Sequence, residues 1–166
     1  MERYTHKKRK DKFHYQLSYS KFNVKEKYLD SRWYMADRCL QNNASMIIGS
    51  KINKHNSVVI RCDISEGFPF TKINLEKSKE HVETIYDIDK GWNTYQDKPR
   101  VKLSVRYDLQ LFLKRSNLTA YFEIQNVFNQ QDVLHEWYIA LGKNKGYIIK
   151  RLSTGIIPIG GLTIDF

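Results

Sequence analysis

Positions 101–114 read VKLSVRYDLQLFLK, and this stretch decides the fold. Its odd positions, from Val101 to Leu113, are all apolar or aromatic, whereas its even positions are polar apart from Phe112. Side chains alternate between the two faces of a β-strand, so this pattern predicts one long strand with an apolar and a polar face. Such a strand is longer than the roughly five or six residues usual in soluble sheets. Its length is sufficient for a tilted strand that crosses a bilayer, which needs about nine to eleven residues or more.

The same alternation recurs along the chain and predicts six strands, near positions 13–24, 42–52, 55–66, 101–113, 118–128 and 156–166. Their polar faces carry charges in mid-strand, among them Arg61, Asp63, Arg106 and Glu123. In a soluble sandwich these charges would face water, and in a membrane barrel they would face the lumen while the apolar face meets lipid. Alternation alone leaves both interpretations open.

The connections between the predicted strands favour the barrel. Two are tight turns, at 53–55 and 114–117, and three are long, at 25–41, 67–100 and 129–155. Short turns that alternate with long loops are typical of outer-membrane barrels, and a connection as long as 67–100 is rare in a compact soluble domain.

We therefore expect an all-β fold, an antiparallel up-and-down segment of a transmembrane β-barrel that is incomplete. The count of about six strands rises to seven if residues 1–5 contribute, and to eight if 129–155 contains a hairpin. A helical turn or two is predicted within 75–86.

Composition and charge exclude several other classes of protein. The 166 residues carry a formal charge of +10, and positions 1–12 form a basic segment, a turn or strand remnant before the strands of 13–166. The longest uncharged stretch, Leu152–Ile164, is too short for a membrane-spanning helix. Two cysteines make neither a disulfide framework nor a zinc cluster, and we expect no secretory signal at the start of the sequence.

No enzyme is predicted. The histidines His14, His55, His81 and His135 are scattered, and none has a metal-ligand spacing from another histidine or cysteine. The pair Asp87 and Asp89 lacks the glycine and acidic pattern of a calcium loop. No phosphate-binding loop or nucleophile elbow occurs, so we expect no catalytic residue, metal or cofactor.

Four short motifs resemble the C-terminal region of TonB-dependent outer-membrane receptors. Residues 126–129, Asn-Val-Phe-Asn, resemble the "N-[LV]-F-[ND]" signature of this family, and residues 156–166 resemble its closing strand with a terminal aromatic residue. Residues 17–21 are similar to its "SYSYSK" strand, and residues 65–71 to the "SG-x-P-Y-T" motif that opens an extracellular loop. Arg38-Cys39 departs from the commoner "R-H" of the family.

This resemblance, over roughly residues 13–166, implies the last quarter or so of a barrel of about 22 strands around a plug. It implies uptake of a scarce ligand, of the siderophore, vitamin or glycan class, across the outer membrane. The expected partners are outer-membrane lipid, the plug and upstream strands of the receptor, and the barrel-assembly machinery through the C-terminal strand. The TonB complex would act only through the missing N-terminal part, so we expect no transport by this chain alone. Nucleic acid is not an expected partner.

The resemblance also assigns residues. Those in family motifs or in the C-terminal assembly signal are Gly67, Pro69, Asn126, Phe128, Asn129, Pro158, Gly161, Leu162, Ile164 and Phe166. Aromatic residues of the long connections are candidates for ligand contact, although the membrane–water girdle is their commoner place: Trp33, Tyr34, Trp92, Tyr95, Trp137 and Tyr138.

Two other classes stay open. A complete small outer-membrane barrel, of porin or adhesin type, would need at least about eight strands. A soluble basic β-protein could bind nucleic acid through Lys7–Lys10 and exposed tyrosines that stack on bases, and its binding would weaken steeply with salt.

Overall fold

The computed structural model describes residues 2–10, 12–28, 31–37 and 39–166. The elements in chain order are β1 Glu2–Lys10, β2 Phe13–Lys21, β3 Lys25–Lys27, β4 Trp33–Met35, β5 Asn42–Lys51, β6 Asn56–Ser65, β7 Pro69–Phe70, α1 Leu75–His81, β8 Tyr95–Gln96, β9 Arg100–Phe112, β10 Asn117–Gln125, β11 Val133–Gly142, β12 Lys145–Leu152 and β13 Ile157–Asp165. Among the described residues, no helix has the length and apolar character needed to cross a membrane.

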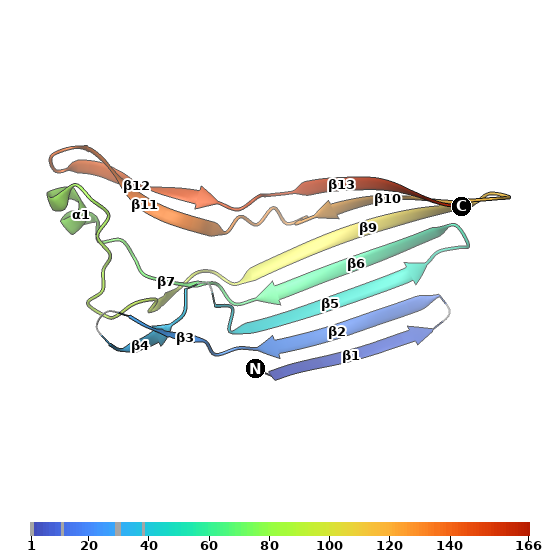
Figure 1. Ribbon diagram of the computed structural model, residues 1–166, viewed down its shortest axis with the longest axis horizontal. Coiled ribbons are helices and arrows are strands. Elements are labelled where there is room, and N and C mark those ends of the chain that lie inside the picture. Colours follow the sequence, from blue (N-terminus) through green and yellow to red (C-terminus); the bar gives the residue numbers. More distant parts are fainter. Residues whose placement is uncertain (1, 11, 29–30, 38) are drawn as a thin grey trace.

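Seven strands form one antiparallel sheet in the order β1-β2-β5-β6-β9-β10-β13 (Figure 1). All six predicted strands are present in it, and β1 adds a seventh. The predicted all-β, antiparallel, up-and-down arrangement is confirmed. The sheet is open over the described residues, because β1 and β13 each pair on one side only.

The connections segregate to opposite ends of the sheet. Short turns join β1 to β2, β5 to β6 and β9 to β10 at one end, and the long connections gather at the other (Figure 1). The β5–β6 turn is closed by Asn53, whose side-chain Oδ1 accepts hydrogen bonds from the backbone nitrogens of His55 at 2.8 Å and Asn56 at 2.9 Å. An asparagine that bonds its own backbone in this way is a common turn former, which explains the tight turn predicted at 53–55.

The strands are paired in a register that keeps the apolar faces together. Leu17 lies opposite Met46, Met46 opposite Cys62, and Cys62 opposite Leu103. One residue further along, the polar residues Ser45, Asp63 and Lys102 lie opposite one another on the other face. The alternation read from each strand therefore adds up to one continuous apolar face and one continuous polar face.

The apolar face of this sheet is exposed. The buried hydrophobic residues among those described are Ala36, Ile73 and Tyr138, and all three lie in the long connections. On the sheet, Phe122 is 52% exposed and Leu162 is 74% exposed. The accessible surface is 12049 Å², whereas a folded monomer of the same mass exposes about 8,600 Å². The seven-stranded sheet is therefore a single layer without a hydrophobic core of its own.

The long connections form smaller sheets beyond the main one. Strands β3 and β4 pair within 25–41, β7 and β8 within 67–100, and β11 and β12 within 129–155. The predicted helical turns form as α1, which begins after Asn74, whose side chain accepts a hydrogen bond from the Lys77 nitrogen. The helix ends at His81, and the next residue, Val82, is left-handed with φ 60°.

The hairpin expected within 129–155 exists, but it does not add an eighth strand to the main sheet. It makes a separate two-stranded sheet of β11 and β12. Along the long axis of the molecule, this sheet lies beyond the ends of β10 and β13 (Figure 1). The break after β10 falls at Asn126, which has φ 54°. A left-handed residue cannot continue a strand, so the predicted strand 118–128 ends at Gln125.

Candidate functional site

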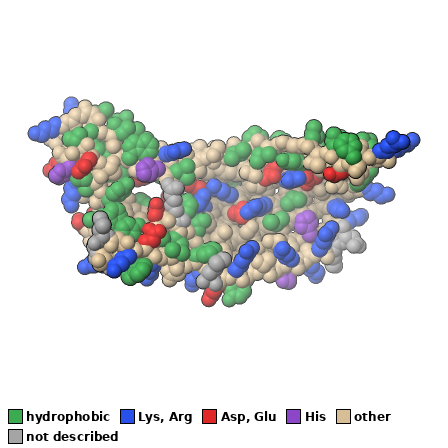
Figure 2. All heavy atoms as spheres, in the orientation of Figure 1, with side chains coloured by type: hydrophobic (Ala, Val, Ile, Leu, Met, Phe, Trp, Pro, Cys, Tyr) green, Lys and Arg blue, Asp and Glu red, His purple; other side chains and the backbone are tan. Residues whose placement is uncertain are grey.

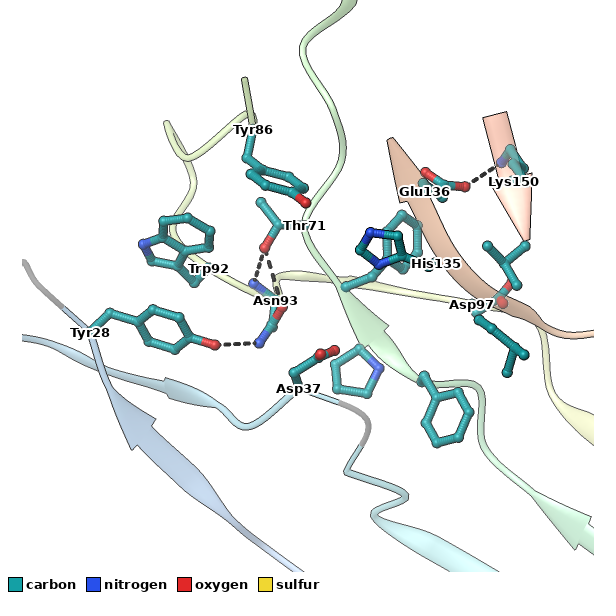
Figure 3. Close-up of a pocket in the computed structure, with 15 residues that line it drawn as sticks. Tyr28, Asp37, Thr71, Tyr86, Trp92, Asn93, Asp97, His135, Glu136 and Lys150 are labelled. Carbon is teal, nitrogen blue, oxygen red and sulfur yellow. Dashed lines mark hydrogen bonds and ion pairs between the residues drawn. The ribbon is translucent and has the colours of Figure 1, made fainter. Parts of the chain in front are cut away.

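The three long connections together enclose a pocket of about 320 Å³ (Figure 3). Its lining comes from all three: Tyr28, Asp37, Phe68, Pro69, Phe70, Thr71, Tyr86, Trp92, Asn93, Asp97, Val133, Leu134, His135, Glu136 and Lys150. This volume lies at the lower end of the range of small-molecule sites, about 300–1,000 Å³. The pocket is therefore the candidate binding site of the chain.

Asn93 ties two of the connections together. Its backbone nitrogen donates to the Thr71 hydroxyl at 2.8 Å, and its side-chain Nδ2 donates to the Tyr28 hydroxyl at 3.0 Å (Figure 3). The same Nδ2 also donates to the Met35 carbonyl at 2.9 Å. Asn93 has φ 53°, a left-handed conformation that asparagine tolerates better than most residues. These bonds fix the 25–41 connection against the 67–100 connection.

Aromatic rings make one wall of the pocket. The Trp92 and Tyr28 rings stack with their centroids 5.1 Å apart and an interplanar angle of 8°, and Tyr86 packs at 5.9 Å from Trp92. Tyr34 meets Tyr28 edge-on at 5.8 Å, and its ring occupies the space that a Cβ at Gly91 would need. Burial raises the pKa of the Tyr28 phenol above its usual value, and the hydrogen bond from Asn93 acts in the opposite direction. Tyr28 is therefore a neutral hydrogen-bonding group at physiological pH.

The hairpin β11–β12 supplies the opposite wall, which is polar. Glu136 of β11 and Lys150 of β12 lie opposite each other and form an ion pair of 2.5 Å. His135 precedes Glu136 in this wall, and Asp97 and Asp37 complete the ring of titratable groups around the pocket (Figure 3). The pocket therefore combines an aromatic wall with several carboxylates.

Of the six aromatic residues predicted for ligand contact, Trp92 alone lines this pocket. Tyr34 supports it through Tyr28, whereas Tyr95 packs on Phe70 and carries the Lys72 ammonium 4.0 Å from its ring centroid. Trp33 is 64% exposed in β4.

The other two candidates lie on the hairpin. Trp137 packs beside His135, with ring centroids 5.5 Å apart, at a separate surface depression. Tyr138 is buried, and its hydroxyl donates a hydrogen bond to the Lys145 carbonyl at 3.0 Å. We therefore read Tyr138 as a packing residue of the hairpin, while the ligand role of the others stays a prediction.

The Asn126–Asn129 motif has a structural explanation. Asn126 is buried, and its Nδ2 donates to the backbone carbonyls of Gln130 at 2.9 Å and Gly155 at 3.1 Å. Asn129 has φ 53°, and its Oδ1 accepts a hydrogen bond from the Ile156 nitrogen at 3.3 Å. The two asparagines hold the junction where β10 leaves the sheet and β13 enters it. Phe128 is 60% exposed beside this junction.

The remaining motif residues divide into close contacts and exposed apolar positions. A Cβ at Gly67 would overlap the Asp97 carbonyl, and a Cβ at Gly161 would overlap the Tyr121 ring. Pro69 pairs with Gln96 and lines the pocket, and Pro158 lies in the edge strand β13. The C-terminal residues Leu162, Ile164 and Phe166 are all exposed.

The polar face of the sheet is rich in paired charges. Arg61 bonds Asp63 at 2.8 Å, and Arg106 bonds Asp108 at 2.6 Å. Asp132, which is 5% exposed, bonds Arg100 at 2.6 Å. Figure 2 shows positive and negative side chains mixed across the sheet face turned toward the viewer. A shallow pocket of about 270 Å³ lies here, between the charged residues of β6, β9 and β10 and residues 153–155.

No cluster of three metal-ligating side chains occurs among the described residues. Of the Arg38-Cys39 pair, Arg38 lies outside the described residues, and Cys39, which stands where the family motif has histidine, is half-buried. Sequence reasoning missed Tyr28, Asn93, Asp97 and Glu136, because they come from three connections whose folding against each other leaves no local pattern. The available signal was an asparagine beside Trp92 and close to Tyr95, because asparagine tolerates the left-handed backbone of a tight loop.

Asn93→Gly tests whether the aromatic wall depends on the side-chain amide. Glycine keeps the left-handed backbone, so the change removes the bonds to Tyr28 and Met35 without backbone strain. We expect a loss of about 1–2 kcal/mol in the stability of this region, seen as faster amide exchange of residues 25–37 and 86–95. Asn144→Gly, at another left-handed asparagine in the β11–β12 turn, is the control and should leave that exchange unchanged.

Comparison with known proteins gives no relative: no family model, no curated protein and no solved structure matches the chain.

Proposed function

We propose that this chain forms the C-terminal part of the barrel of a TonB-dependent outer-membrane receptor, which takes up a scarce ligand of the siderophore, vitamin or glycan class. The observation that carries the proposal is the exposed apolar face of a single-layer antiparallel sheet. Water makes such a face costly, whereas the hydrocarbon of a bilayer accepts it. The opposite face, with its paired charges, suits a lumen filled by polar protein and water.

The strand lengths support the same reading. The seven strands of the sheet have nine to thirteen residues each, and a tilted strand needs about nine to eleven residues to cross the hydrocarbon core. A soluble sandwich would cover the apolar face with a second sheet, and the small sheets of the described chain lie beyond the end of the main sheet instead (Figure 1).

The unpaired edges favour a part of a barrel over a complete one. Six antiparallel pairings separate β1 from β13, so these two edge strands run in the same direction. Bacterial single-chain barrels have an even number of antiparallel strands, and lipid cannot satisfy an open edge. Adding the hairpin β11–β12 would bring two strands and leave the count odd. The proposed partner is therefore the rest of a receptor, which supplies an odd number of strands.

Part of the basic N-terminal segment fits this proposal without a nucleic-acid partner. In β1, Lys7 lies opposite Gln16 and Arg9 opposite His14, so these two side chains belong to the polar face of the sheet, whereas Lys8 lies opposite Tyr15 on the apolar face. We therefore assign Lys7 and Arg9 to the lumen of the proposed barrel, and the proposed localisation is the outer membrane.

The native Cys62 offers a direct test, because it lies on the apolar face in β6. With Cys39→Ala, a nitroxide on Cys62 of the full chain in phosphatidylcholine vesicles should be relaxed by lipid-soluble oxygen and shielded from a water-soluble nickel chelate. The matched control is Ser45→Cys with Cys39→Ala and Cys62→Ala, which places the label on the polar face of the neighbouring strand. That label should show the reverse preference.

Equal contact of both labels with the nickel chelate, or a chain that stays soluble and monomeric without lipid or detergent, would contradict the proposal. Salt-dependent binding of nucleic acid by such a soluble chain would favour the alternative class instead. A closed monomer with steady channel conductance would favour the complete small barrel.

A further inference from the structure

We infer that the end of the main sheet that carries the short turns binds the headgroups of anionic phospholipids. We call this end the basic rim, and it consists of the turns at residues 10–12, 51–55 and 113–117. The inference rests on the proposed function, because it names the lipid partner of one end of the same membrane-embedded sheet. The observations behind it are the positive charge of the rim, the lack of counter-charges and the apolar side chains beside the cations.

Positive charge is concentrated in the basic rim. Its 13 positions hold six lysines or arginines and one acidic residue, and Asp165 of β13, opposite Asn117, adds a second carboxylate at this end. The long connections 22–41, 66–99 and 126–156 are almost neutral, with 13 basic and 12 acidic residues. Figure 2 shows Lys and Arg side chains at the rim end of the sheet. The two ends of the molecule therefore differ in charge, and an anionic partner is attracted to the rim.

Backbone hydrogen bonds hold the three turns side by side in one row (Figure 1). The Lys51 nitrogen donates to the Lys12 carbonyl at 2.7 Å, which joins the first turn to the second. The Gln110 nitrogen donates to the His55 carbonyl at 2.6 Å, which joins the second turn to β9. Since neighbouring strands lie about 4.8 Å apart, successive turns lie about 10 Å apart. Cations at this spacing add their fields and concentrate anions along the whole row.

The described side chains of the rim leave their positive charges unpaired. Lys12, Lys51, Lys54, Lys114 and Arg115 are exposed, and none of them forms an ion pair within the described chain. The arginines of the polar face differ in this respect, because Arg61, Arg100 and Arg106 each pair with an aspartate. The rim cations are therefore available to an external anion such as a lipid phosphate.

Exposed apolar side chains accompany the cations in each turn. Phe13 follows the first turn, Ile52 lies in the second and Leu113 in the third, and all three are exposed. At a membrane interface, such side chains enter the hydrocarbon while the cations beside them meet the headgroups. A polyanion dissolved in water would bind the cations and leave the apolar side chains in water. The combination therefore favours a phospholipid over a nucleic acid.

The same partner accounts for Lys8, which the register places on the apolar face opposite Tyr15. Lys8 lies two residues before the end of β1, close to the first turn of the rim. The long stem of a lysine lies along apolar surface while its ammonium group reaches the headgroups. A lysine at this position is therefore compatible with a sheet whose apolar face meets lipid.

Electron spin resonance with spin-labelled lipids tests the inference on the full chain in phosphatidylcholine vesicles. Trace amounts of labelled phosphatidylglycerol or labelled phosphatidylcholine report how strongly each lipid associates with the protein, because lipid beside the protein is restricted in its motion. We expect phosphatidylglycerol to associate about three- to fivefold more strongly than phosphatidylcholine at low salt. This preference should fall below about twofold in 1 M NaCl, where the screening length is about 3 Å.

Two double variants that remove the same charge from opposite ends of the molecule locate the effect. Lys51→Gln with Lys54→Gln, in the rim, should lower the preference for phosphatidylglycerol about twofold or more. Lys143→Gln with Lys145→Gln, at exposed positions of the β11–β12 hairpin, is the matched control and should leave the preference unchanged.

Equal association of the two lipids, or an equal loss in the two double variants, would overturn the inference. Binding of a short DNA duplex that the rim variant weakens, without any lipid preference, would assign the rim to nucleic acid instead. Restricted lipid of both kinds without a preference means that the rim inference alone is wrong. The absence of any restricted lipid would contradict the membrane proposal as well.

Discussion

Asp132→Ala should lower the free energy of unfolding by about 3 kcal/mol, one of the largest effects of a single substitution in this chain. The Asp132 carboxylate is 4% exposed and lies 2.6 Å from the Arg100 guanidinium and 3.2 Å from the Lys102 ammonium. Arg100 is 16% exposed, and its buried Nε has no hydrogen-bond partner within the described chain. Alanine would leave a largely buried cation without a counter-charge, and this uncompensated charge is the source of the expected loss.

The location of Asp132 adds to the effect. Its backbone nitrogen donates to the Ser153 hydroxyl at 2.9 Å, and its carbonyl accepts from the Ser153 nitrogen at 2.8 Å. The residue therefore joins the start of β9 to the base of the β11–β12 hairpin. We expect the substitution to release the hairpin as well as to destabilise the sheet.

Urea unfolding of the vesicle-bound chain, followed by tryptophan fluorescence, would measure this loss. Asp63→Ala is the matched control, because the Asp63 side chain is 30% exposed and its partner Arg61 is 57% exposed. An ion pair in water contributes about 0.2–1 kcal/mol, so this control should change stability by less than 1 kcal/mol. If Asp132→Ala lowers the free energy of unfolding no more than Asp63→Ala does, the buried ion pair contributes no more stability than the exposed one.

The sheet could be predicted from the sequence because the alternation of apolar and polar residues marks each strand locally. The alternation of 101–113 appears in β9 with nearly the same bounds, 100–112, and the asparagine turn at 53–55 follows from the local sequence alone. Strand pairing then follows from keeping the apolar faces together. Two predicted strands are three residues too long: 13–24 ends at Lys21, and 118–128 ends at Gln125. The second error comes from the left-handed Asn126, whose partners Gln130 and Gly155 are brought to it by tertiary structure.

The candidate site could be predicted only in part, because it depends on contacts between connections that are far apart in the chain. Trp92 was predicted from its residue type, but its stacking partner Tyr28 lies in another connection. Residue type alone also cannot separate Trp92, which lines the pocket, from Tyr138, which packs inside the hairpin. The hydrogen bonds of Asn93 to Tyr28 and Met35 fix the position of the aromatic wall. No periodic pattern in the sequence predicts these bonds.

The second large effect is expected from an arginine placed on the apolar face. Met46→Arg should lower the stability of the vesicle-inserted chain by about 2–4 kcal/mol, which is the cost of arginine near the bilayer midplane. Met46 is 38% exposed on β5, between Leu17 and Cys62 of the neighbouring strands, so neither cross-strand neighbour offers a polar side chain that could pair with the new charge.

Ser45→Arg is the control that differs by a single position. Ser45 lies on the polar face opposite Asp63, where a guanidinium finds a carboxylate and water. It should therefore change stability by less than about 1 kcal/mol. Urea titration of the inserted fraction, measured by flotation of the vesicles, compares the two variants directly.

The contrast between these two arginines separates the membrane proposal from a soluble sheet more sharply than either variant alone. If the apolar face met water, Met46→Arg would be neutral or would improve solubility, because the side chain is already exposed and arginine is well solvated. If the face meets lipid, the same change is costly and the neighbouring change is not. Equal stability of the two variants in vesicles would therefore remove the membrane proposal, whatever the pocket at the loop end binds.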